Sequence, residues 1–172
     1  MKPLLTLLLL LSILCPNFAQ SIDSEASKIT FEISNMGLNT VEGTFGGMNG
    51  TVQFDSQNLA NSRFDVCISA ESVNTGIDKR DKHLREEDYF AVAQYPNICF
   101  RSSTISQTAE GFVAEGTLTM RGVSKEVRIP FTFANKTFNG TLTVKRKDYN
   151  IGPGGGFMVG KTVEMEIICV LK

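Results

Sequence analysis

The chain has 172 residues, of which 42% are hydrophobic and 20% are charged, and its formal net charge is −1. This balance excludes the basic footprint of a nucleic-acid-binding protein and the polybasic segment that recruits a protein to anionic membranes. About 150 residues remain after the N-terminal segment described next, which is enough for one domain with one core.

The first residues have the pattern of a secretory signal peptide. A lysine precedes an almost unbroken run of apolar residues, and the small residue Ala19 follows a polar turn. The run is too short to span a bilayer, so we expect residues 1–19 to be removed and residues 20–172 to form a single domain. A periplasmic or secreted protein is therefore expected. Lipidation of Cys15 is the alternative, and the bulky Leu14 before it disfavours that alternative.

Three cysteines remain in the mature chain, Cys67, Cys99 and Cys169. An odd number leaves at least one thiol free in an oxidising compartment, and the spacing is not that of a zinc site. Cys67 and Cys99 both fall in expected strands, on the face opposite to their apolar neighbours. A surface disulfide between them is geometrically conceivable, but we expect free thiols because nothing in the sequence supports the pairing.

Strand alternation dominates the mature chain. Apolar side chains at every second position indicate half-buried strands at 29–33, 41–45, 52–54, 64–70, 98–100, 111–120, 127–133, 142–144 and 163–169. The connections are short, which favours antiparallel pairing with one solvated face. A sandwich and an up-and-down barrel both satisfy this pattern. We favour the barrel, because the chain has no Greek-key signature and no tryptophan of the immunoglobulin kind.

Two local features qualify this pattern. Pro130 cannot donate to a ladder, which argues for an edge strand or a bulge at that point. A charged stretch, with Asp78 as a plausible N-cap, interrupts the alternation and has few apolar residues. It predicts a short, mostly solvated helical segment around residues 78–91 that caps the strands. A charged connector with no role in ligand binding is the alternative.

The interior of an eight-stranded barrel is either filled by its own side chains or holds one small ligand. Gly43, Gly116 and Gly140 fall at inward positions, where missing side chains would leave an apolar void among phenylalanines. Alternatively, these glycines mark bends that close the barrel. Arg146 and Asp148 continue the inward parity at one strand end. They form either a local ion pair or a contact for the polar head of a guest.

Several short motifs follow one another along essentially the whole mature chain: Met36-Gly37-Leu38, Asn74-Thr75-Gly76, Lys79-Arg80-Asp81, His83-Leu84-Arg85, Tyr95-Pro96, the run from Gly116 to Lys125 and the run from Arg146 to Ile151. Together they resemble the YceI-like family of bacterial periplasmic proteins. The resemblance implies a lipocalin-like, eight-stranded antiparallel β-barrel with a short helix. It further implies binding of polyisoprenoid chains or isoprenoid quinones in an internal pore, for transport, storage or sequestration. Asn35 stands where the family often has histidine.

The inward positions and the resemblance together give the expected ligand site. We expect a polyisoprenoid or another long apolar lipid to contact Phe31, Ile33, Val41, Gly43, Phe45, Val66, Ile68, His83, Leu84, Phe90, Phe100, Gly116, Leu118, Phe131, Phe133, Leu142, Val144 and Arg146. We expect no metal, no nucleic acid and no cofactor other than a bound isoprenoid lipid or quinone. A transient membrane contact and a homodimer are left open.

Two other functions compete with lipid binding. An enzyme would need a nucleophile, a base and an orienting group, and His83 is the only imidazole, with no serine or cysteine marked as its partner. The glycine-rich loop at 152–156 precedes a strand, whereas a dinucleotide site requires a helix there. A filled structural or protein-binding barrel without a lipid is the second alternative.

Overall fold

The computed structural model describes residues 19–35, 39–153 and 159–172. All but the last residue of the expected signal peptide, the Met36-Gly37-Leu38 motif and most of the glycine-rich loop lie outside the described residues. Among the residues that are described, no helix is long and apolar enough to cross a membrane.

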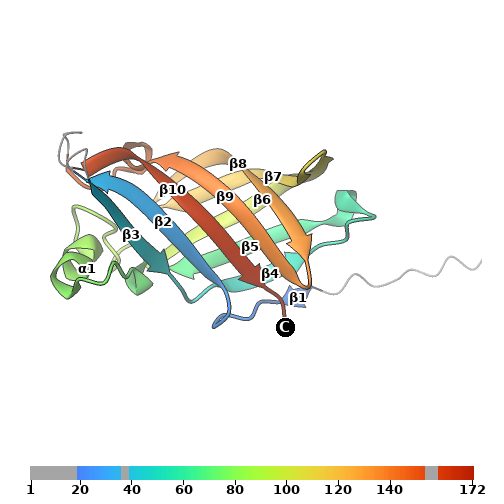
Figure 1. The fold of residues 1–172 in the computed structure, drawn as a ribbon, viewed down its shortest axis with the longest axis horizontal. Helices are drawn as coiled ribbons and strands as arrows, with labels where there is room; N and C mark the ends of the chain where they lie inside the picture. Colours follow the sequence, from blue (N-terminus) through green and yellow to red (C-terminus); the bar gives the residue numbers. More distant parts are fainter. Residues whose placement is uncertain (1–18, 36–38, 154–158) are drawn as a thin grey trace, which may run out of the picture.

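Ten strands form one curled antiparallel sheet (Figure 1). In chain order they are β1 (Gln20–Ser21), β2 (Lys28–Asn35), β3 (Asn39–Phe45), β4 (Asn49–Gln53), β5 (Arg63–Ser69), β6 (Asn97–Thr108), β7 (Gly111–Met120), β8 (Val123–Ala134), β9 (Thr137–Lys145) and β10 (Val159–Val170). Their order in the sheet is β1-β4-β5-β6-β7-β8-β9-β10-β2-β3. The all-β, antiparallel, lipocalin-like fold class is confirmed. The sheet contains the nine strands that alternation indicated and, in addition, the two-residue β1, which is too short to show alternation, so it has two strands more than the eight that the resemblance implied.

The two edge strands, β1 and β3, are not paired with each other among the described residues, and isolated bridges tie the chain near each edge to other segments. Ile22, just after β1, pairs with Leu171 at the end of β10, and Thr44 of β3 pairs with Asn74. The sheet is therefore a half-barrel. Pro130 lies inside β8, which has a neighbour on both sides, and not on an edge strand as one reading expected. Pro130 lies opposite Val113 of β7, whereas pairing of β8 with β9 begins one residue later, at Phe131, so Pro130 has a ladder partner on one side alone.

The helical segments are short. They are α1 (Asp78–Arg85) and the 3₁₀ turns η1 (Leu59–Asn61), η2 (Ala70–Ser72) and η3 (Arg146–Tyr149). The helix ends well before residue 91, because Glu86 is already extended and turns follow it. Asp78 is the first helical residue and not the N-cap, a place taken by Ile77 without a side-chain hydrogen bond.

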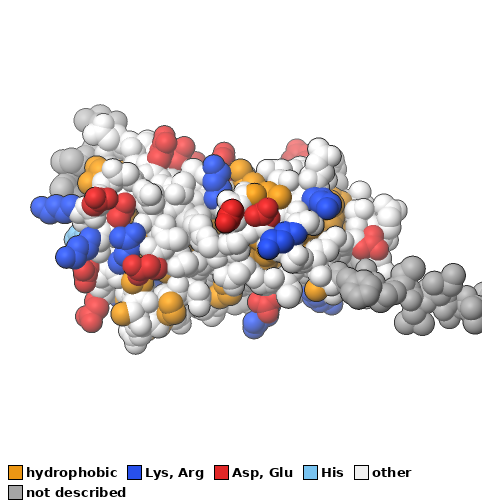
Figure 2. Space-filling model, turned by 90° about the horizontal axis from the view of Figure 1, so that it is seen from below, with side chains coloured by type: hydrophobic (Ala, Val, Ile, Leu, Met, Phe, Trp, Pro, Cys, Tyr) orange, Lys and Arg blue, Asp and Glu red, His pale blue; other side chains and the backbone are white. Residues whose placement is uncertain are grey.

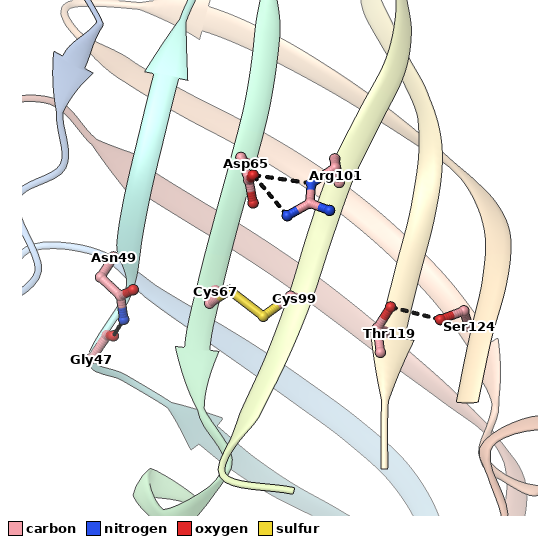
Figure 3. Close-up of a disulfide and its surroundings, with 8 residues drawn as sticks. All are labelled: Gly47, Asn49, Asp65, Cys67, Cys99, Arg101, Thr119 and Ser124. Atoms are coloured by element: carbon pink, nitrogen blue, oxygen red, sulfur yellow. Dashed lines mark hydrogen bonds and ion pairs between the residues drawn. A yellow bond between two sulfur atoms is a disulfide. The ribbon is translucent and has the colours of Figure 1, made fainter. Parts of the chain in front are cut away.

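A disulfide joins Cys67 of β5 to Cys99 of β6 on the outer face of the sheet (Figure 3). The two cysteines are directly opposite each other in the ladder, with Cα atoms 4.1 Å apart. The next outward pair along the same strands is the salt bridge between Arg101 and Asp65, at 2.9 Å. The expectation of free thiols at 67 and 99 is therefore wrong. Cys169 is free and buried.

Candidate functional site

The sheet encloses a cavity of about 300 Å³ with a largely apolar lining. Inward-facing side chains on its wall are only half-buried, among them Ile33, Val41, Val163, Met165 and Ile167. In a filled core such positions would be fully buried against neighbours. These side chains therefore face open space, and the interior is hollow along β2, β3 and β10.

A cluster of phenylalanines closes one end of the cavity. Phe54, in the loop after β4, contacts five others with ring centroids 5.1 to 6.1 Å apart: Phe64, Phe112, Phe131, Phe133 and Phe138. Three of these rings, Phe64, Phe131 and Phe138, also line the cavity. Large aromatic side chains thus meet across the barrel at this end, which we call the phenylalanine plug.

The opposite end carries the polar part of the lining. Besides the apolar residues there, it contributes Ser34, Asn35, Thr75, Arg80, His83, Tyr89 and Arg146. The His83 side chain is 61% exposed and yet lines the cavity, so the cavity reaches the surface beside α1. On the face shown in Figure 2, acidic and basic side chains lie next to one another at this end, so neither sign of charge dominates it.

Hydrogen bonds from its charged side chains hold α1 in place. Asp81 is buried and accepts from the backbone N–H of Thr75 at 2.9 Å and from the Thr75 hydroxyl. Arg80 donates from Nε to the Thr75 hydroxyl oxygen at 2.7 Å and from Nη2 to the Thr75 carbonyl at 2.8 Å. Arg85 donates to the carbonyls of Glu71 and Val73, both at 2.8 Å.

These bonds explain why the stretch is so rich in charge. Its guanidinium groups and the buried carboxylate replace the core packing that the segment lacks. Apolar residues of the same segment, Leu84 and Phe90, then line the cavity, and the Phe90 ring lies edge-on to Phe45 of β3 at 5.3 Å. The segment therefore builds part of the cavity wall.

Arg146 and Asp148 take different places. β9 ends at Lys145 and η3 begins, so the inward parity of the strand stops there. Arg146 is 4% exposed and donates to the carbonyl of Gly160 and to that of Ile151, both at 2.8 Å. Asp148 is exposed. Arg146 thus ties the chain on either side of the glycine-rich loop to the cavity wall.

The surroundings of His83 are those of a surface residue. Its Nε2 lies 3.1 Å from Oδ2 of Asp88, and its ring is edge-on to Tyr89 at 5.0 Å. No group of three or more histidine, cysteine or acidic residues that could hold a metal ion occurs in the part of the chain that the structure describes.

Most of the expected site residues lie on the cavity wall. Those that line it are Phe31, Ile33, Val41, Phe45, Val66, Ile68, His83, Leu84, Phe90, Phe100, Leu118, Phe131, Leu142, Val144 and Arg146. Their contact with a ligand stays a prediction. The structure places Gly43, Gly116 and Phe133 away from the lining.

Each of these three exceptions has a physical reason. The ring of Phe31 covers Gly43, so the missing side chain leaves no void there. A Cβ at Gly116 would overlap the carbonyl oxygen of Arg101, because the backbone of β6 approaches closely beside a bulge. Phe133 belongs to the rear of the phenylalanine plug. Of the inward glycines, only Gly140 lines the cavity.

The sequence reasoning also missed several lining residues. Strand parity alone would have found Ile29, Ile129, Phe138, Val163, Met165, Ile167 and Cys169. Parity could not find Arg80 and Tyr89, which lie outside strands. Met48 is another such residue, since it lies in the connection between β3 and β4 and is buried.

Fold and cavity together define a lipocalin-like β-barrel with an apolar interior and polar groups at one end. The YceI-like domain family matches residues 20–171, and the chain belongs to this family. A UPF0312 protein of Photorhabdus laumondii is 34% identical over 87% of this chain and 71% of its own length. One of Yersinia enterocolitica is 32% identical over 76% of this chain and 74% of its own length.

Solved structures show the same fold. Burkholderia cenocepacia BcnA superposes with a TM-score of 0.81 at 27% identity, covering 88% of this chain and 99% of that one. A polyisoprenoid binding domain from Saccharophagus degradans gives a TM-score of 0.68 at 19% identity, covering 90% and 98%. The Campylobacter jejuni YCEI protein gives 0.67 at 23% identity, covering 78% and 86%.

Proposed function

We propose that this protein holds the chain of a polyisoprenoid or an isoprenoid quinone in its cavity, in the periplasm or after secretion, for transport, storage or sequestration. The half-buried inward side chains of β2, β3 and β10 carry the proposal, because they leave apolar surface for a guest to cover. Membership of the YceI-like family supports it, and so does the polyisoprenoid binding described for the Saccharophagus degradans neighbour of the same fold.

The energetics favour a hydrocarbon guest. Each buried methylene contributes about 0.8 kcal/mol, so one isoprene unit with five carbons contributes about 4 kcal/mol before ordering is subtracted. Association costs roughly 4 to 15 kcal/mol in lost freedom, so a guest needs more than one unit inside. The polar groups beside α1 can meet the head of such a guest with little dehydration.

The rival functions fit the geometry less well. A filled structural barrel would leave its inward side chains fully buried, and here many are not. His83 lies on the surface with an acid and an aromatic ring beside it, which orients the imidazole but supplies no nucleophile. A homodimer and a transient membrane contact stay predictions, which light scattering and vesicle co-sedimentation would test.

Organic extraction of the purified protein tests the proposal directly. Mass spectrometry should find a co-purifying prenyl lipid, and the extracted protein should bind farnesol saturably, measured by displacement of a fluorescent apolar probe. Val163→Asn should weaken this binding at least tenfold, because it places an amide on the cavity wall.

The neighbouring Glu164 offers a matched control, because its side chain is exposed on the outer face of the same strand. Glu164→Asn should bind as the wild type does. A clean extract together with no saturable farnesol binding would overturn the proposal and favour the filled-barrel reading.

A further inference from the structure

We propose that the phenylalanine plug sets the length of chain the cavity accepts: the last two or three isoprene units of a guest enter tail first and end against the plug. This inference rests on the proposed function and narrows it. Longer chains would bind too, with their remaining units and their head outside, beside α1.

The packing of the plug prevents its rings from moving aside for a longer guest. Phe64, Phe131 and Phe138 face the cavity and are at most 9% exposed. Behind them, Phe54 lies 5.3 Å from Phe138 and 5.1 Å from Phe133 between ring centroids, and Phe133 lies 4.4 Å from Phe138. A ring that faces the cavity therefore cannot retreat without displacing a second ring.

The distribution of polar groups fixes the direction of the guest. Every hydroxyl, amide, imidazole and guanidinium group of the described lining lies at the α1 end, and phenylalanines line the other end. An amphiphile inserted head first would bury its polar group against phenylalanine rings without a hydrogen-bond partner. The apolar tail must therefore lead.

The length of the lining strand and the volume of the cavity each give the number of isoprene units that fit inside. The lining residues of β9 run from Phe138 to Val144, a distance of about 20 Å along the strand and about 15 Å along a barrel axis inclined by roughly 40°. An isoprene unit adds four backbone bonds of about 1.5 Å, hence about 5 Å when extended, which gives about three units. The cavity volume of about 300 Å³ corresponds to about ten groups the size of a water molecule, or about two units.

A series of prenyl alcohols with two to five isoprene units tests this length. We expect the affinity of the wild type to rise at least about tenfold with each unit up to the third, because each adds buried carbons. Beyond the third unit the affinity should change less than about threefold, because further carbons stay outside. Probe displacement gives the dissociation constants.

Two variants should move this plateau in opposite directions. Phe138→Ala removes a ring that faces the cavity and should move the plateau to about one unit more. Ile167→Phe should move it to about one unit fewer, because Ile167 is half-buried on the cavity wall beside its cross-strand partner Gly140, so a ring there would extend into the cavity. Ile168→Ala is the matched control, since Ile168 adjoins Ile167 on β10 but neither belongs to the plug nor lines the cavity. Its plateau should stay at the wild-type length.

The outcomes separate this inference from the proposed function. If no alcohol binds the wild type, the lipid-binding proposal itself fails. If the alcohols bind but affinity keeps rising through five units, or if neither Phe138→Ala nor Ile167→Phe moves the plateau, the plug is not the stop and lipid binding stands. Should Phe138→Ala not fold, Phe138→Leu and Ile167→Phe decide the question.

Discussion

Cys169 lies on the cavity wall near the plug end and is 6% exposed. Burial raises the pKa of its thiol from 9.0 to about 11, although a hydrogen bond with Ser27 opposes the rise. The thiol therefore stays protonated and apolar in the folded protein at neutral pH, which suits a hydrocarbon guest. It also makes the folded state sensitive to alkaline pH, as does Tyr149, whose pKa burial and the charge of Asp148 raise to about 12.

The raised pKa of the Cys169 thiol makes the folded state less stable at alkaline pH. Above pH 9 the unfolded chain loses the thiol proton while the folded chain keeps it, so the free energy of unfolding falls until the pH passes 11. We expect a loss of about 1 kcal/mol between about pH 8 and pH 10. Urea denaturation of the wild type and of Cys169→Ala at both pH values measures it. The variant should lose clearly less, and equal losses would contradict the assignment to Cys169.

Individual residues also show where sequence reasoning succeeds and where it stops. Alternation placed Ile33, Leu142 and Val144 on the inner face correctly, because side-chain direction has a strict period of two in a strand. It could not tell an empty inward position from a covered one. At Gly43 the ring of the cross-strand Phe31 takes the space, and this depends on a rotamer and a register that a single strand does not encode.

At the scale of elements, β5 and β6 flank the segment that contributes α1, and with it part of the cavity wall, to one end of the cavity. The chain leaves β5 at Ser69, forms η2 and α1, and returns into β6 at Asn97. The Cys67–Cys99 disulfide joins these two strands (Figure 3), two residues before β5 ends and two residues after β6 begins. It thereby closes the segment into a covalent loop whose base cannot spread.

We expect this disulfide to stabilise the fold by about 3 to 4 kcal/mol, because it closes a loop with a sequence separation of 32. Replacing both Cys67 and Cys99 by alanine should lower the free energy of unfolding by that amount and speed hydrogen exchange in α1. Treatment with a reductant should have the same effect on the wild type. Cys169→Ala, which keeps the disulfide, should still respond to the reductant, and an unresponsive wild type would contradict this role.

The sequence could not reveal this pairing for a definite reason. Both cysteines were placed on the outer face of their strands, but a disulfide needs them opposite each other, and the register of β5 and β6 follows from how the inserted segment folds. The segment between β5 and β6 also has the weakest sequence signal for its secondary structure. Its helix is held by Arg80, Asp81 and Arg85 bonding to backbone, whereas amphipathic periodicity is the signal that sequence analysis detects best.

At the scale of the molecule, alternation and the family motifs sufficed for the fold class, whereas the hollow interior was expected from the resemblance, since Gly43 and Gly116 leave no void. Alternation and the motifs did not suffice for the plug, because its central ring, Phe54, lies in a loop where no periodicity assigns a direction. The half-barrel closure was equally hidden. It depends on isolated bridges such as Ile22 to Leu171, between residues at opposite ends of the mature chain.

A guest that fills the cavity should stabilise the whole fold. With farnesol at about 100 times its dissociation constant, the free energy of unfolding should rise by about 2.7 kcal/mol, because the unfolded chain has no cavity. For a domain of this size the melting temperature should rise by about 5 to 10 °C. Differential scanning calorimetry measures the shift. At the same farnesol concentration Val163→Asn should show at most about half of this shift, because tenfold weaker binding leaves about 1.4 kcal/mol. An equal shift in that variant would mean that farnesol binds elsewhere.

The phenylalanine plug at one end of the cavity determines the route by which a guest can enter and leave. A guest cannot pass through a cavity that is closed by the phenylalanine plug at one end. It must therefore leave through the opening by which it entered. Under the proposed function, the donor and the acceptor of the lipid would therefore use the same opening beside α1, one after the other. The donor and the acceptor would then bind this protein sequentially at that opening, and could not dock at the same time at opposite ends of the barrel.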